Sequence, residues 1–164
     1  MKIKNAILFS CILYSVGCFS VHASDSTITI TGTVLQKTCV TPQDVTVPLG
    51  NLYVSDFPTE GSFSQWRDFD LNLTACQNTN NVRITLNGSA QGDKYFANNG
   101  NAQGIKIEIQ DRDGTNTQYY TGAVKTVVVR GDSANFNFKA RAVRDGDVSP
   151  GTINSVLTAS FTYL

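Results

Sequence analysis

SDSTITITGTV, residues 24–34, is the stretch from which the fold can be worked out. Ser26, Ile28, Ile30, Gly32 and Val34 occupy one parity of this stretch, and threonines fill most of the other. Because successive side chains of a strand point to opposite faces, the pattern predicts one strand with an apolar face and a threonine face. No hairpin turn joins it to the residues that follow. It is either an extended arm or an ordinary first strand of a sandwich.

Residues 1–23 have the organisation of a secretory signal peptide. Lys2 and Lys4 precede an apolar run over residues 6–16, and small residues lead to a plausible cut after Ala23. The apolar run is shorter than the roughly 20 residues that a membrane-spanning helix needs. Lipoprotein cleavage before Cys18 is the alternative, but the position three residues earlier lacks a bulky aliphatic side chain. We therefore expect export through the periplasm.

Cleavage after Ala23 leaves one domain with a real core and excludes several functions. The remaining 141 residues carry 11 Lys and Arg against 13 Asp and Glu, so the net charge is −2 and binding to nucleic acid is not expected. His22 is the only histidine and leaves with the signal, which removes catalytic triads and typical zinc sites. We expect no enzyme activity, no small-molecule substrate, no cofactor and no metal.

Two cysteines remain in the exported chain. Cys11 and Cys18 lie in the signal, so Cys39 and Cys76 are the only pair left in an oxidising compartment. A structural disulfide follows by elimination, and two free buried thiols are the alternative.

The chain beyond the arm indicates an all-β sandwich. Strict alternation of apolar and polar residues predicts strands over residues 69–75, 82–86, 105–109, 124–129 and 136–142. Residues 34–40 and 45–49 are also expected to be strands, with Pro42 and Pro48 favouring an edge, and residues 89–104 a loop. Helical periodicity is nowhere sustained, so about eight short strands are expected.

The C-terminal segment, residues 151–164, reads as a last strand that ends with the chain. Its apolar face comprises Ile153, Leu157, Ala159, Phe161 and Tyr163. If the sandwich is one strand short, a cleft beside this strand stays open.

Taken together, these features resemble a chaperone–usher pilus subunit of the type 1 fimbrial kind. The resemblance covers the whole mature chain. It rests on the alternating arm, the pair Cys39 and Cys76, the run GIKIEIQD at residues 104–111, and the ending with Gly151 fourteenth from the terminus and Tyr163 penultimate.

The resemblance implies an incomplete immunoglobulin-like β-sandwich that lacks its last strand. Residues 24–35 would be a donor-strand arm and residues 36–164 the pilin domain. The groove would be filled first by a periplasmic chaperone and then, after delivery to an outer-membrane usher, by the arm of a neighbouring subunit. The implied donor face is Ser26, Ile28, Ile30, Gly32 and Val34. The implied chaperone-binding edge is Gly151, Ile153, Leu157, Ala159, Phe161 and Tyr163.

Adhesins of this family usually carry a second, sugar-binding domain and no arm, so a single domain with an arm is similar to a minor tip or adaptor subunit of a surface fimbria. A major shaft subunit is the alternative position. A free-standing secreted sugar-binding sandwich is the alternative function, with a platform made from Trp66, Tyr95, Tyr119 and Tyr120. Asp111 and Asp113 are candidates for a hydrolase pair or a calcium loop. They share one short turn and lack a later carboxylate, which disfavours both.

Overall fold

The computed structural model describes residues 28–164, so the predicted signal segment and Ser26 lie outside the described residues. Residues Val34–Leu164 form one compact unit. Its helical content is a single 3-10 turn, Val54–Asp56, and no helix within residues 28–164 is long and apolar enough to cross a membrane.

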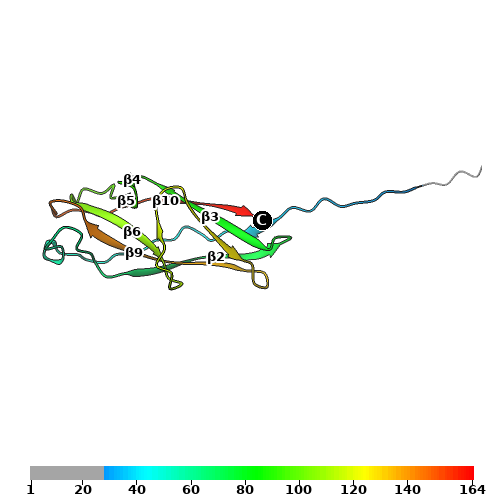
Figure 1. The fold of residues 1–164 in the computed structure, drawn as a ribbon, viewed down its shortest axis with the longest axis horizontal. Helices are drawn as coiled ribbons and strands as arrows, with labels where there is room; N and C mark the ends of the chain where they lie inside the picture. The colour runs from blue at the N-terminus through cyan, green and yellow to red at the C-terminus, as the bar shows by residue number, and fades with distance from the viewer. Residues whose placement is uncertain (1–27) are drawn as a thin grey trace, which may run out of the picture. The chain divides into compact units, whose positions relative to one another are not determined.

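Two antiparallel sheets form this unit, which confirms the predicted all-β sandwich (Figure 1). The larger sheet has the order β1 (Thr38–Val40), β2 (Arg67–Gln77), β9 (Ala134–Arg144), β6 (Ile105–Asp111), β5 (Tyr95–Ala97) and β4 (Ala90–Gln91), with β7 (Gln118–Tyr119) also pairing with β6. The smaller sheet has the order β10 (Leu157–Tyr163), β3 (Asn81–Gly88) and β8 (Ala123–Val128). Every pairing between strands is antiparallel.

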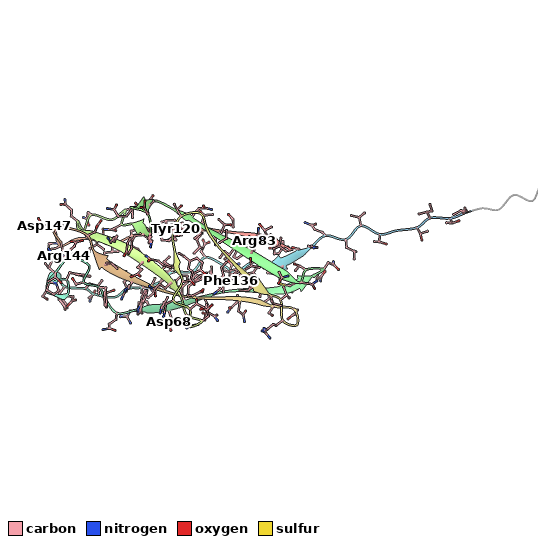
Figure 2. The ribbon with its side chains drawn as sticks, viewed as in Figure 1. Asp68, Arg83, Tyr120, Phe136, Arg144 and Asp147 are labelled. Atoms are coloured by element: carbon pink, nitrogen blue, oxygen red, sulfur yellow. A yellow bond between two sulfur atoms is a disulfide. The ribbon has the colours of Figure 1, made fainter. Side chains whose placement is uncertain are left out.

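The core lies between the sheets and follows the period-two patterns of the sequence. Its largest fully buried side chains are Phe96, Phe136, Phe138, Leu73, Ile84 and Val82. Figure 2 shows Phe136 within the sandwich and Asp68 on the outer side of the large sheet. The ring of Phe136 lies 6.4 Å from that of Phe138 and 6.0 Å from that of Phe161 on β10. Strand β10 therefore contributes its apolar face to the core.

Some expected strands are shorter than their sequence pattern. Only Thr38–Val40 pairs within residues 34–40, and residues 45–49 form no strand. Pro42 and Pro48 have no N–H to donate to a ladder, yet Val47 and Leu49 still pack against the core. The expected loop at residues 89–104 contains the short strands β4 and β5, and β7 is a further short strand that the sequence did not predict. With the strand at residues 45–49 missing, residues 28–164 form ten strands instead of about eight.

The predicted disulfide between Cys39 and Cys76 is confirmed, and the alternative of free thiols is wrong. It joins β1 to β2 where their register shifts, between the pairs Thr38↔Gln77 and Val40↔Thr74. Ala75, next to Cys76, has a left-handed φ of 49°. The register shift leaves one extra residue on β2, and a left-handed residue is one of the conformations that such a bulge adopts.

Candidate functional site

Strand β10 is an edge strand of the small sheet. It pairs with β3 along its whole length, from Leu157↔Gly88 to Tyr163↔Val82. No strand within residues 28–164 pairs with its other side, and Figure 1 shows β10 in red beside the green β3. The sandwich is therefore incomplete at this edge.

The backbone groups at the open edge belong to alternate residues of β10. Leu164 N donates to Asn81 O at 2.8 Å, and Asn81 N donates to Leu164 O at 3.4 Å, so the even-numbered residues pair with β3. The N–H and C=O groups of neighbouring residues in a strand point to opposite sides. Those of Leu157, Ala159, Phe161 and Tyr163 therefore face the open side, and no backbone partner for them occurs within residues 28–164.

The side chains of these same residues form the floor of the edge. Leu157, Ala159, Phe161 and Tyr163 are half-buried against the core cluster, whereas Thr158, Ser160 and Thr162 between them are exposed. The Tyr163 hydroxyl reaches across to Cys39 O of β1 at 3.4 Å. Unpaired backbone groups thus lie beside apolar side chains that are only partly covered. An edge of this kind can accept a further strand.

Gly151 precedes β10 and packs directly against another loop. A Cβ atom at this position would come within 2.4 Å of Ala102 N. The bond Ala102 N to Thr152 O (3.1 Å) and the bond Asn99 N to Asn154 O (2.6 Å) hold the two segments together. The residues of this segment that accept these bonds, Thr152 and Asn154, are even-numbered, like the residues of β10 that pair with β3. Residues 151–154 therefore extend β10 with the same orientation of backbone groups, although the strand itself begins at Leu157.

An apolar pocket lies beside the beginning of this edge. Its lining includes Leu52, Phe57, Ile105, Val148 and Ile153. Ile153 therefore shares the inward orientation predicted for it, and the whole set predicted as one face shares one side of the segment.

Residues 28–33 have no regular secondary structure, and all are exposed. Ile28 is 83% exposed and Ile30 is 92% exposed, while Val34, at the start of the compact unit, is 100% exposed. A Cβ atom at Gly32 would meet no other atom within 4 Å. The apolar face of the predicted arm is therefore uncovered.

The aromatic residues considered for a sugar platform differ in exposure, and Tyr120 is 44% exposed. Tyr119 is buried, and its hydroxyl donates to Asp111 Oδ2 at 2.9 Å. Burial, and then the hydrogen bond to Asp111, raise the pKa of Tyr119 well above its usual value. The Tyr95 ring is covered by Lys106 Nζ, 4.2 Å from its centroid, and the Trp66 ring by the Arg141 guanidinium at 4.2 Å.

Asp111 and Asp113 face an ammonium group. Lys125 Nζ pairs with Asp111 and lies 3.4 Å from Asp113 Oδ2, which links β8 of the small sheet to the end of β6 in the large one. Hydrogen bonds from Thr115 lower the pKa of Asp113 to about 2, with a smaller effect of Lys125. Among residues 28–164, no three His, Cys, Asp or Glu side chains are grouped to hold a metal ion.

Solved structures with this architecture include pilus subunits. The P pilus rod subunit PapA matches with a TM-score of 0.65 over 77% of this chain and 99% of that chain, at 19% identity. The P pilus adaptor subunit PapF matches with a TM-score of 0.53 over 77% of this chain and 95% of that one, at 16% identity. The sandwich therefore has the immunoglobulin-like fold of pilins.

Sequence relatives identify the family. The S-fimbrial adhesin protein SfaS of Escherichia coli O6:K15:H31 is 56% identical over 99% of both chains. Protein FimG of Escherichia coli K12 is 38% identical over 88% of both chains. The family model for fimbrial proteins matches residues 28–163, so the chain belongs to the fimbrial protein family. It is a structural subunit of a fimbria at the cell surface, assembled with neighbouring subunits, and not an enzyme.

Proposed function

We propose that this subunit polymerises by donor-strand complementation. Its arm, residues 24–35, would insert into a neighbouring subunit, and the open edge of β10 would accept the arm of another. The observation that carries the proposal is the edge itself, where backbone groups without partners lie beside half-buried apolar side chains. An alternating arm supplies what such an edge lacks, since its backbone extends the ladder and every second side chain enters the core.

The apolar face of the arm has enough area to drive insertion. Ile28, Ile30 and Val34 are largely exposed, and burying each of them contributes about 1.5 to 3 kcal/mol. Gly32 is the small member of the set and suits a shallow point of the groove. Ser26, which lies outside the described residues, completes the donor face.

Before assembly, the same edge is the surface on which we propose that a periplasmic chaperone binds. Leu157, Ala159, Phe161 and Tyr163 supply both ladder groups and apolar contacts, and Ile153 extends the face toward the pocket. Gly151 contributes by letting residues 151–154 lie close to residues 98–102. An outer-membrane usher then receives the complex after its transit through the periplasm.

Within the fibre, we propose a minor tip or adaptor position that links an adhesin to the shaft. A link between two subunits must accept one strand and donate another. One domain with one open edge and one arm meets both requirements. SfaS matches over 99% and FimG over 88% of both chains, which supports a subunit of similar size.

The test offers a synthetic peptide of residues 24–35 to purified subunits of the same fimbria, and asks whether the full chain co-purifies with the chaperone from periplasm. We expect one partner subunit to take up the peptide and the chain to be recovered in a chaperone complex. A chain recovered as a stable free monomer, with a peptide that no subunit binds, would refute donor-strand complementation.

A second candidate role is direct adhesion, since SfaS is named an adhesin. On the outer face of the large sheet, the Arg141 guanidinium lies 3.7 Å from the Phe63 ring centroid and 4.2 Å from that of Trp66, and Lys139 Nζ lies 4.8 Å from the latter. Aromatic rings beside cations suit a ligand with an acidic group and an apolar face. Fibres with Lys139→Ala should assemble normally and bind target cells less. Unchanged cell binding would exclude this surface.

A further inference from the structure

The outer face of the small sheet has a composition that differs from that of the large sheet. Its outward residues are Arg83, Thr85 and Asn87 on β3, Val124, Thr126 and Val128 on β8, and Thr158, Ser160 and Thr162 on β10. Arg83 is the only charged residue among them. The outer face of the large sheet instead carries ion pairs such as Arg141–Glu108 and Arg112–Asp68. Hydroxyl and β-branched side chains thus cover the small sheet up to its open edge.

The arm also has hydroxyl-bearing, β-branched side chains, on the face that would point away from the groove after insertion. Its threonines at 27, 29, 31 and 33 alternate with the apolar set, so they point outward whenever the apolar set points into a groove. This relation holds for either direction of insertion, because it depends on parity alone.

We propose that the outward threonines of an inserted arm pair across the junction with Thr158, Ser160 and Thr162, so that this edge selects arms with a hydroxyl-bearing, β-branched outer face, of the kind this chain itself carries. The inference rests on donor-strand complementation and adds a second determinant to it. The apolar face supplies burial, and the threonine face distinguishes among arms and registers.

The geometry of β10 places these pairs where side chains approach most closely. All strand pairings in this protein are antiparallel, and the backbone groups that face the open side belong to Leu157, Ala159, Phe161 and Tyr163. Those residues form the hydrogen-bonded pairs with an antiparallel arm, so Thr158, Ser160 and Thr162 occupy non-hydrogen-bonded positions. Opposed Cα atoms are about 4.5 Å apart there, against about 5.5 Å at hydrogen-bonded positions. Thr–Thr and Thr–Ser pairs stabilise sheets at this separation.

The protein already contains a related row, at hydrogen-bonded positions where opposed Cα atoms are about 5.5 Å apart. Ser160 lies opposite Thr85 of β3, and Thr85 lies opposite Val124 of β8. An arm threonine facing Ser160 from the open side would extend this row from three strands to four. Because a slip by one residue would turn the isoleucines outward and the threonines inward, the two faces of the arm specify the same register.

The test is a set of double-mutant cycles between the full-length chain and fluorescent peptides of residues 24–35. The chain carries Ser160→Ala or, as a matched control two strands away, Thr126→Ala. The peptides carry Thr29→Ala, Thr31→Ala or Thr33→Ala. We expect each change facing the junction to weaken binding about two- to fivefold. For one arm threonine, the change to alanine should no longer weaken binding to the Ser160→Ala chain but should still weaken binding to the Thr126→Ala chain. That threonine is the one opposite Ser160, so the result also identifies the register.

The outcomes separate this inference from the function on which it rests. If the wild-type peptide binds, Ile28→Asp/Ile30→Asp abolishes binding, and every threonine change is additive with Ser160→Ala, donor-strand insertion holds and the threonine pairing is wrong. If the wild-type peptide does not bind this chain, the edge does not select arms of this kind and the threonine pairing is wrong, whereas donor-strand complementation is decided by whether a partner subunit takes up the peptide. A peptide with valine at 29, 31 and 33 keeps the β-branch, so its loss of affinity measures the hydroxyl contribution alone.

Discussion

The disulfide between Cys39 and Cys76 joins β1, the first strand of the large sheet, to β2. The loop between them spans 37 positions, and closing it stabilises the fold by about 4 kcal/mol on the chain-entropy estimate. Cys39→Ala should therefore lower the free energy of unfolding by about this amount and reduce periplasmic yield. Urea unfolding of wild type and variant measures the difference. Cys39→Ala/Cys76→Ala should match the single variant, and wild-type stability in either would show that the bond adds nothing.

Gly151 is required by a close approach of two backbones. A methyl group would stand 2.4 Å from Ala102 N and 2.7 Å from Ala102 Cα, so Gly151→Ala must push residues 98–102 away. We expect a destabilisation of about 1 to 3 kcal/mol, the usual cost of overpacking. Gly32→Ala is the matched control, because no atom lies within 4 Å of its added Cβ. Equal thermal stability of the two variants would contradict this role of Gly151.

Asp145 makes part of the stability depend on pH. Its carboxylate accepts a hydrogen bond from Gln91 Nε2 at 2.7 Å and one from Lys106 Nζ at 3.0 Å, and these two contacts lower its pKa. Since the folded pKa lies below the unfolded one, the stabilisation is present above about pH 4 and is lost as the pH falls through the folded value.

Urea unfolding at several pH values tests this dependence. Asp145→Asn should lose less stability than wild type between about pH 5 and pH 3. Asp147→Asn, at a fully exposed side chain, should follow the wild-type curve. Identical curves for all three proteins would show that Asp145 does not contribute.

At the scale of single elements, the open edge of β10 offers a substitution that separates folding from recognition. The N–H of Ala159 faces the open side, so Ala159→Pro removes a ladder donor for the incoming strand and leaves the pairing with β3 intact. Losing one net hydrogen bond of about 0.5 to 1.5 kcal/mol should weaken binding of chaperone or arm roughly two- to tenfold.

The matched control is Ser160→Pro, which removes an N–H directed at β3 and should impair folding. Circular dichroism and a chaperone pull-down distinguish the two variants. If Ala159→Pro unfolds the subunit while Ser160→Pro does not, the assignment of backbone groups to the two sides of β10 is wrong.

The elements also show what can be deduced from sequence and what cannot. Alternation alone was enough to predict which face of residues 153–163 points inward, because the side-chain period of a strand does not depend on its partner. It did not predict where β10 begins, since residues 151–154 are held by residues 98–102, some 50 positions away. The strand expected at residues 45–49 failed for a different reason, because its alternation is clear but Pro42 and Pro48 cannot donate to a ladder.

The contacts made by charged residues could not be predicted from sequence either, because their partners come from distant parts of the chain. Asp111 ends β6 and Asp113 lies on the turn after it, a segment that sequence alone presents as solvent-facing. The Lys125 ammonium that they meet comes from β8 in the other sheet. The disulfide was predictable because only one pair of cysteines was left to form it.

At the scale of the whole molecule, the donor and acceptor roles lie at opposite ends of the chain and can be tested apart. Ile28 and Ile30 are exposed, so Ile28→Asp/Ile30→Asp should leave the subunit folded, bound by chaperone and able to accept an arm. The variant should fail to insert into its neighbour, because two carboxylates would enter an apolar groove without partners, at a cost of several kcal/mol in addition to the lost burial.

Fibre growth should therefore stop at the junction that this arm makes. A chaperone pull-down of the variant, together with electron microscopy of fibres from cells that express it, measures both halves of the prediction. Thr29→Asp/Thr31→Asp places the same charges on the opposite parity, where an inserted arm faces solvent, and should impair insertion far less. An ordinary first strand predicts the reverse for the isoleucine variant, since charges at Ile28 and Ile30 would then disrupt the subunit's own core. A misfolded isoleucine variant, or equal loss of fibres in both variants, would mean that the arm is not a donor strand.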